Sequence, residues 1–216
     1  FHLAGIVPIA GQPLDFDQAW PDCLMPIAPD YSLLEAAVVE CAYAGCDTIW
    51  IICNDDISPL IRKKLGDFVK DPVYAHRRHE RKPDQTIRYI PIYYVPIHPK
   101  HRDKVDNYAW SVIYGANVAY WIHTKFSRWT RPDQYYVSFP MGVMDPKEVL
   151  EHRSLLRKNA PFYFSHEGKT VKDGAPISFV INPEEWRRAK HTITTNASVW
   201  KAPDEGIPTE KLPPEE

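Results

Sequence analysis

The sequence predicts an α/β fold in which a mixed, mainly parallel sheet carries helices on both faces. Two apolar runs, residues 3–9 and 47–53, lack the alternation of polar and apolar side chains, which is typical of strands buried on both faces. A helix signature lies between the two runs. Strand, helix and strand in this order favour a right-handed crossover that places the two strands parallel to each other.

The helix between the two strands is predicted from its ends. Ser32 is followed three residues later by Glu35, the pattern in which each side chain binds a backbone N–H beside the other residue. Gly45 is expected to end the helix, because glycine readily adopts the left-handed conformation of a C-terminal cap. One apolar stripe joins the two ends and consists of Leu34, Val38, Cys41 and Ala42.

Further elements are predicted downstream of this unit. Asp145 and Asn182 are each followed by a proline and, three residues on, by a glutamate, a pattern typical of helix starts. The last two strands are expected to flank a hairpin or meander around Gly168 and Gly174. Helices are predicted over residues 58–68, 112–122, 145–153 and from 182 onward, and strands over 88–95, 134–139, 162–164 and 177–181.

The composition is that of a soluble globular protein. Hydrophobic residues make up 44% of the 216 residues and charged residues 25%, which excludes disorder for the bulk of the chain. The net charge of −2 provides no global attraction for nucleic acid or for an anionic membrane surface, and no apolar window is long enough to span a bilayer. We therefore expect a cytoplasmic protein that does not bind membranes.

The chain is predicted to form one α/β domain over residues 1–200, followed by a tail. Residues 201–216 are rich in proline and glutamate and are too polar to build a core. The four cysteines contain no C-x-x-C pair, so we expect reduced thiols that pack as small hydrophobic side chains. The 21 prolines and only 9 glycines indicate stiff loops and argue against an ordinary glycine-rich phosphate loop.

The first 56 residues carry an ordered set of motifs. A strand leads into Ala10-Gly11, the segment Pro21-Asp22-Cys23-Leu24-Met25-Pro26-Ile27 follows, and the capped helix ends in Ala44-Gly45 before a strand that ends in Cys53-Asn54-Asp55. In order and spacing this resembles the start of a divergent sugar-phosphate nucleotidyltransferase-like, glycosyltransferase-A-type protein. The resemblance implies a three-layer, Rossmann-like fold of the nucleotide-diphospho-sugar transferase type.

The resemblance also implies an activity and a site. Enzymes of that family transfer a nucleotidyl group from a nucleoside triphosphate to a sugar phosphate, with Mg²⁺ and release of pyrophosphate. The backbone of Ala10, Gly11 and Gln12 corresponds to the part that approaches the nucleotide or sugar-nucleotide. Asp22 and Asp55 are the candidate catalytic carboxylates. Asp22 stands in the proline motif that resembles the family, and Asp55 follows the carboxyl end of a predicted strand, where open α/β sheets bind ligands. Asp145 is the candidate metal ligand.

Three departures from the family pattern keep a second interpretation open. Asp22 stands where the family has a lysine, no arginine precedes Arg62, and the strand that should end in Gly-Asp ends in Pro140-Met141-Gly142. The alternative is a catalytically inactive descendant of this fold, a structural or binding module in a larger assembly. In that case the aromatic residues and the tail would contact a protein partner or a second copy of the chain. Asp55 and Asp145 would then serve only as loop and helix-cap residues.

Two basic segments, residues 76–82 and 98–102, offer a third interpretation. Histidine, arginine and lysine are concentrated there, with tyrosines nearby in the sequence. Such a pattern is typical of a site for nucleotide phosphates or for a nucleic-acid backbone. The alternative is a solvated loop at the rim of an interface.

Overall fold

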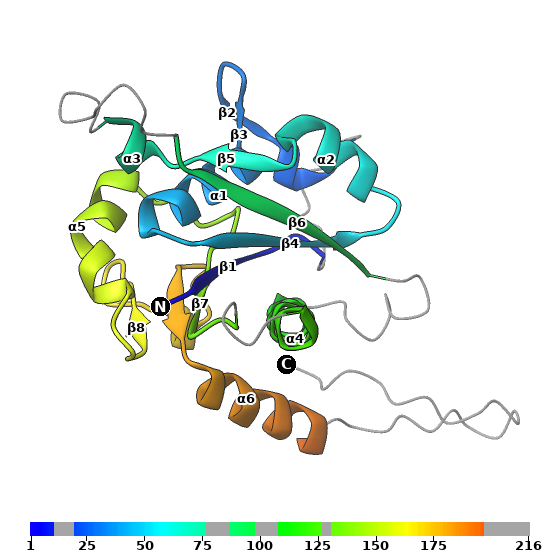
Figure 1. Cartoon of the computed structure of the whole chain (residues 1–216), viewed down its shortest axis with the longest axis vertical. Coiled ribbons are helices and arrows are strands. Elements are labelled where there is room, and N and C mark those ends of the chain that lie inside the picture. The colour runs from blue at the N-terminus through cyan, green and yellow to red at the C-terminus, as the bar shows by residue number, and fades with distance from the viewer. Residues whose placement is uncertain (11–19, 77–86, 98–107, 127–130, 197–216) are drawn as a thin grey trace, which may run out of the picture.

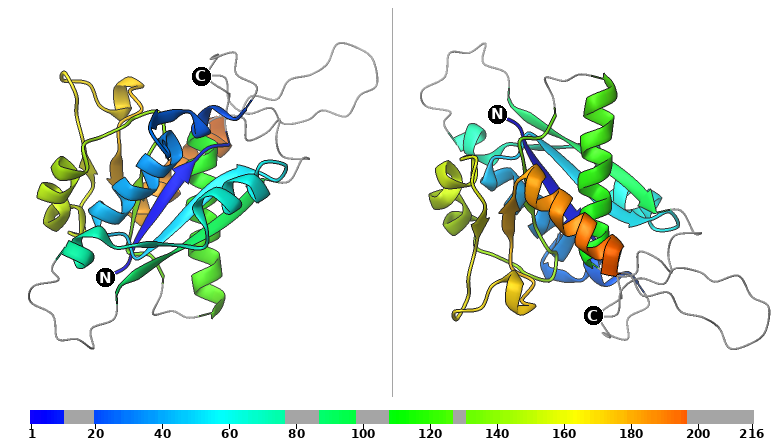
Figure 2. Two further views of the ribbon diagram at one scale, coloured as in Figure 1. Left: turned by 90° about the horizontal axis from the view of Figure 1, so that it is seen from above. Right: turned by 90° about the horizontal axis from the view of Figure 1, so that it is seen from below.

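The chain folds into three layers, with one central sheet between two layers of helices (Figure 1). The computed structural model describes residues 1–10, 20–76, 87–97, 108–126 and 131–196. Helices α1 (Leu33–Ala44) and α5 (Pro146–Leu156) cover one face of the sheet, whereas α4 (Tyr108–Phe126) and α6 (Pro183–Asn196) cover the other (Figures 1 and 2). The predicted three-layer α/β architecture is confirmed.

Seven strands form the sheet, in the order β5-β6-β4-β1-β7-β9-β8. The four central strands are parallel: β6 (Tyr89–Ile97), β4 (Thr48–Asn54), β1 (Leu3–Pro8) and β7 (Gln134–Val137). The outer strands run antiparallel to their neighbours: β5 (Phe68–Lys70), β9 (Phe179–Ile181) and β8 (Phe162–Tyr163). The sheet is therefore mixed and mainly parallel, as the apolar runs predict.

The strand–helix–strand unit at the start of the chain forms as predicted. β1 and β4 pair in parallel with Ile6 opposite Trp50, and α1 connects them. Ser32 and Glu35 form the capping box, since the backbone N–H of Ser32 donates to Glu35 Oε2 at 2.8 Å and that of Glu35 donates to Ser32 Oγ at 3.4 Å. Gly45 ends the helix in the left-handed region with a φ of 89°. Local hydrogen bonding thus sets both ends of α1.

Several short elements escape the sequence-based prediction. The helix predicted over residues 58–68 is shorter, because α2 (Ser58–Leu65) stops at Gly66, whose φ is 77°, and the chain continues as β5. The proline-rich loop contains a 3-10 helix, η1 (Asp22–Leu24), and the hairpin of β2 (Pro26–Ala28) and β3 (Tyr31–Ser32). A short helix, α3 (Pro72–His76), follows β5.

The later elements are found with shifted bounds. The helix predicted over residues 112–122 extends to 19 residues as α4, whereas the two C-terminal strands shorten to β8 and β9. Between these strands lies a 3-10 helix, η5 (Val171–Asp173), near the predicted turns at Gly168 and Gly174. Within the described ranges, no helix has the length and apolar character needed to cross a membrane. The tail, residues 201–216, lies outside the described residues.

Each face of the sheet has its own core. Side chains of β1 alternate between the two, with Leu3 and Val7 packed beneath α1 and α5 and Ala4 and Ile6 packed against α4 and α6. The four cysteines are buried and free, as predicted, and Cys41 belongs to the core beneath α1. Burial of β1 on both faces explains why its sequence lacks polar alternation.

Arginines and aspartates tie the elements together at the amino edge of the parallel strands. Arg88 pairs with Asp47 at 2.5 Å and with Asp71 at 3.4 Å, while Arg153 of α5 also reaches Asp71 at 3.4 Å. Arg153 and Arg157 in addition donate to backbone carbonyl groups at the C-terminal end of α1. Cations at a helix C-terminus are favourable, because the last carbonyl groups carry partial negative charge.

We predict that Asp71→Ala lowers the free energy of unfolding by about 3 kcal/mol, because Arg153 loses its carboxylate partner and Arg88 keeps only Asp47. Asp71 is only 1% exposed and also accepts the N–H groups of Val73 and Tyr74 at the start of α3. Urea titration measures the loss. The matched control is Asp67→Ala, which removes an exposed ion pair with Arg62 and should cost less than about 1 kcal/mol. Equal losses in the two variants would contradict the assignment.

Candidate functional site

The carboxyl edge of the parallel strands collects the residues singled out from the sequence. β1, β4, β6 and β7 run in the same direction, so the chain leaves all four at one edge of the sheet. Ala10 follows β1, Asp55 follows β4 and Phe139 follows β7. Ligands of open α/β sheets bind at this edge, in the crevice outside the strand ends. Ala10 and Asp55 therefore follow strands that end at the same edge of the sheet, and the assignment of a site to them stays a prediction.

Ala10 is held in place by hydrogen bonds from both sides. Its backbone N–H donates to the Ile52 carbonyl of β4 at 3.0 Å, and the Ser111 hydroxyl of α4 donates to its carbonyl. Ala10 is only 2% exposed. The backbone of Ala10 is therefore fixed between β4 and α4. Gly11 and Gln12, the other two residues predicted to approach a nucleotide, lie outside the described residues.

Asp22 lies in η1 with a carboxylate oxygen that has no partner. Its Oδ2 is buried and finds no hydrogen-bond donor among the described residues. Burial raises the pKa of the Cys23 thiol to about 12, and the charge of Asp22 adds to this effect. Burial likewise raises the pKa of Tyr108 at the start of α4, with smaller contributions from Cys23 and Asp22. Asp22 therefore lies close to the N-terminus of α4.

Asp55 lies near a buried thiol of β4. Burial raises the pKa of Cys53, and the charges of Asp56 and Asp55 raise it further. Cys53 in turn contributes to the raised pKa of Cys23, which Asp22 also affects. Asp55 is exposed in the turn before α2, and the N-cap of α2 is Ile57, which makes no side-chain cap.

Asp145 caps the N-terminus of a helix. It is the N-cap of α5, and its Oδ1 accepts the backbone N–H of Lys147 at 2.9 Å. Asp145 is exposed, and across the described ranges no group of three or more histidine, cysteine, aspartate or glutamate residues is placed to hold a metal ion. The assignment of Asp145 as a metal ligand stays a prediction. So does the polyanion site, because most of residues 76–82 and all of 98–102 lie outside the described residues.

The segment after β7 explains one departure from the family pattern. At Gly142, which stands beyond Pro140 and Met141, an added Cβ would lie 1.7 Å from the Pro176 carbonyl oxygen. No side chain fits at that distance, so the glycine allows the turn after β7 to pack directly against the segment that precedes β9. The sequence Pro140-Met141-Gly142 therefore serves a backbone contact at this position.

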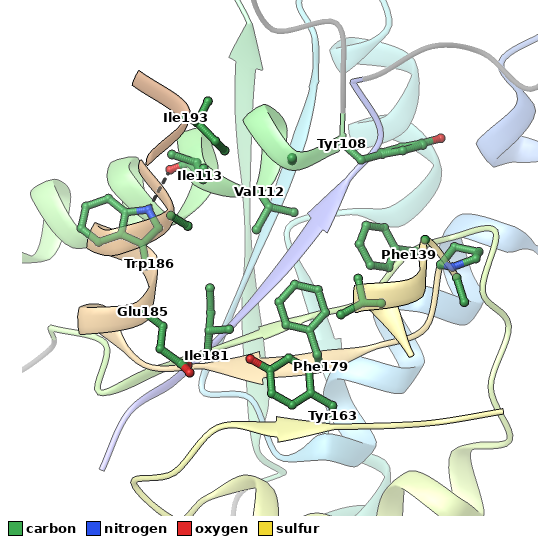
Figure 3. A pocket seen from close by; sticks show the side chains of 16 residues that line it. Tyr108, Val112, Ile113, Phe139, Tyr163, Phe179, Ile181, Glu185, Trp186 and Ile193 are labelled. Carbon is green, nitrogen blue, oxygen red and sulfur yellow. Dashed lines mark hydrogen bonds between the residues drawn. The ribbon is translucent and has the colours of Figure 1, made fainter. Parts of the chain in front are cut away.

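A cavity of about 510 Å³, which the sequence did not reveal, opens between α4, α6, η5 and the strands β8 and β9 (Figure 3). Its walls are almost entirely apolar. The lining residues that Figure 3 labels are Tyr108, Val112, Ile113, Phe139, Tyr163, Phe179, Ile181, Glu185, Trp186 and Ile193. Because these residues come from five segments of the chain, no local pattern signals the cavity. Only the density of aromatic residues after residue 107 hints at it.

Aromatic rings connect the cavity with the carboxyl edge. Tyr108 meets Phe139 edge-on with ring centroids 6.0 Å apart, and Phe139 meets Phe179 at 6.1 Å. Phe179 in turn stacks on Tyr163 at 6.1 Å with an interplanar angle of 14°. Tyr108 therefore lines the cavity and also lies within electrostatic range of Asp22.

Helix α1 carries a buried carboxyl group, Glu40, that lies inside the core. Glu40 is 2% exposed, and its Oε1 accepts hydrogen bonds from the Tyr136 hydroxyl at 2.6 Å and from the Ser178 hydroxyl. Burial raises the pKa of Glu40 to about 7, although these hydroxyl donors oppose the shift. Glu40 links α1 to β7 and to the residue before β9. It is a structural group, since it belongs to the closed interior of the domain.

We predict that Glu40→Gln removes a pH dependence of stability. The folded state binds the Glu40 proton more tightly than the unfolded state does, so stability falls as the pH rises from about 4.5 to about 7. This group alone should cost about 3 kcal/mol between pH 4 and pH 8, at about 1.4 kcal/mol for each pH unit. Glutamine reproduces the protonated acid, so the variant should gain on the wild type as the pH rises.

Urea titrations of the two proteins at pH 4 to 8 measure this difference. The matched control is Glu151→Gln, an exposed position on α5. Parallel pH profiles for wild type and Glu40→Gln would disprove the proposed titration.

The topology and the edge define the class of the protein: this chain has a nucleotidyltransferase-like fold of the nucleotide-diphospho-sugar transferase type. A UDP-glucose pyrophosphorylase complexed with UDP-glucose superposes with a TM-score of 0.52, at 15% identity over 88% of this chain and 80% of that one. The 4-diphosphocytidyl-2C-methyl-D-erythritol synthase of Anaerococcus prevotii gives 0.51, at 11% identity over 94% and 78%. Neither a family model nor a curated protein matches the sequence. The likeness therefore shows the fold.

Proposed function

We propose that the chain binds a nucleotide or sugar-nucleotide at the carboxyl edge of the sheet and transfers a nucleotidyl group from a nucleoside triphosphate to a sugar phosphate. A phosphate oxygen of the acceptor forms a bond to the α-phosphorus of the triphosphate, and the bond from that phosphorus to the β-phosphate oxygen breaks, so that pyrophosphate leaves. The names of the two structural neighbours, one of which was solved with UDP-glucose, support this assignment.

The observation that carries the proposal is the Asp22 Oδ2 atom, which is buried and has no hydrogen-bond partner among the described residues. A bare carboxylate beside a phosphate is unfavourable, since two like charges at 4 Å repel by about 1 kcal/mol in water and by more in a partly buried site. A divalent cation between the two groups turns this repulsion into attraction. Mg²⁺ is commonly held by only one or two carboxylates together with substrate phosphates, so Asp22 fits this role.

The remaining edge residues have positioning roles in this proposal. The hydrogen bonds of Ala10 to Ile52 and Ser111 hold its backbone beside β4 and α4. Asp55 lies at the rim, exposed to an entering ligand. When bound, Mg²⁺ would neutralise charge on the phosphate oxygens. Asp22 would hold the cation, and Asp145 is the second residue to test as a ligand.

We predict that nucleoside triphosphates with Mg²⁺ raise the melting temperature of the wild type. Binding at 100 times the dissociation constant adds about 2.7 kcal/mol, which corresponds to about 5 to 10 °C for a domain of this size. Asp22→Asn should lose the Mg²⁺-dependent part of the shift and the release of pyrophosphate with glucose 1-phosphate as acceptor. The matched control is Asp67→Asn, which changes an exposed carboxylate directly before β5. This variant should behave as the wild type.

The outcomes separate the interpretations. No shift with ATP, GTP, CTP, UTP or dTTP would contradict the nucleotide site. A shift without pyrophosphate release would favour the binding module over the enzyme. Asp145→Asn distinguishes a ligand from a cap, because asparagine caps a helix about as well as aspartate. Loss of the Mg²⁺-dependent shift indicates a ligand, whereas unchanged stability with the shift retained indicates the cap alone.

A further inference from the structure

The apolar cavity is a second site, separate from the phosphate chemistry proposed at the edge. Its volume of about 510 Å³ lies in the range of small-molecule sites, which is roughly 300 to 1,000 Å³. The cavity lies between α4, α6, η5 and the strands β8 and β9, and part of it opens to solvent (Figure 3). A concave space bounded by several elements suits a compact molecule.

Contacts between neighbouring elements fix the walls of the cavity in place. Trp186 is 4% exposed, and its indole N–H donates to the Ile113 carbonyl at 3.2 Å, which fixes α6 against α4. On the opposite side, Thr170 and Asp173 form a capping box around η5. The segment after η5 rests on Gly142 through Pro176. The cavity is therefore formed before any ligand arrives, which lowers the entropic cost of binding.

The lining selects against hydroxylated ligands. Of its sixteen residues, Tyr108, Tyr163, Glu185 and Trp186 carry polar side-chain atoms, and the indole N–H of Trp186 is already used by Ile113. A sugar in this space would bury several hydroxyl groups without hydrogen-bond partners, which weakens binding. Aromatic rings such as those of Phe179 and Phe139 favour a flat or alicyclic apolar body instead.

The polar groups of Tyr163 and Glu185 lie together at one end. Both residues line the cavity, and Figure 3 shows the Tyr163 hydroxyl pointing toward the Glu185 carboxylate. The charge of Glu185 also contributes, after burial, to the raised pKa of Tyr163. An ionised carboxylate only accepts hydrogen bonds. Its partner in a ligand must therefore be a donor, such as a hydroxyl or an N–H group.

From these observations we propose that the cavity binds a small apolar molecule with an aromatic or alicyclic body and one hydrogen-bond donor directed at Glu185 and Tyr163. This site does not depend on the proposed transferase activity. N-phenyl-1-naphthylamine is a suitable probe, because it is uncharged, has two aromatic groups and carries one N–H group. Its fluorescence rises when it enters an apolar site.

We predict saturable binding of one probe molecule to the full chain. Ala189→Phe places a ring at the mouth of the cavity, on α6, and should weaken probe binding at least tenfold. Ala160→Phe makes the same change at an exposed alanine outside the lining and should leave the affinity unchanged. Glu185→Gln replaces the charged acceptor by a neutral one and should weaken binding about threefold.

Absence of saturable binding to the wild type, or equal affinities of Ala189→Phe and the wild type, would overturn the proposal. A dimer in size-exclusion chromatography that Ala189→Phe converts to a monomer would also overturn it, since a second copy would then cover the cavity. The Mg²⁺-nucleotide shift of Ala189→Phe should equal that of the wild type. Failure of the cavity proposal can thus be told apart from failure of the nucleotide proposal.

Discussion

Two aspartates shared by three arginines determine how this domain is assembled. Asp47 and Asp71 lie at the amino edge of the parallel strands, and Arg88, Arg153 and Arg157 reach them from β6 and α5. Arg153 and Arg157 also bind carbonyl groups at the end of α1, so one network joins the first helix, the fifth helix and the strand starts. Such charges are costly to bury singly and are stable only together. The amino edge is thereby occupied by a structural ion-pair network, whereas the proposed nucleotide site lies at the carboxyl edge.

The parts of the fold that the sequence predicts are those that local physics determines. The capping box of Ser32 and Glu35 and the left-handed Gly45 require only neighbouring residues, so α1 is placed to within one residue. The buried strands β1 and β4 are recognisable because both of their faces are apolar. β5 and the β2–β3 hairpin depend on a pairing partner, and no pattern within three residues can specify one.

The candidate site residues also differ in whether local sequence or distant contacts determine them. Parallel strand order alone predicts that Ala10 and Asp55 follow strands at one edge, whereas Asp22 is a candidate only through its place in the motif that resembles the family. Asp145 illustrates the reverse case, because its position before a proline already indicates the cap that the structure contains. Glu40 could not be predicted as a buried acid. Its position in the apolar half of α1 makes sense only once Tyr136 and Ser178 are placed against it.

The burial of the four cysteines has a chemical consequence. Thiolates, not thiols, react with oxidants and alkylating reagents, and burial raises the pKa of Cys23, Cys41 and Cys53. Packing alone therefore protects the folded chain from oxidative damage, without any disulfide. The same sulfur atoms become reactive when the domain opens, so chains that unfold together would crosslink, and a loss of folding would become irreversible aggregation.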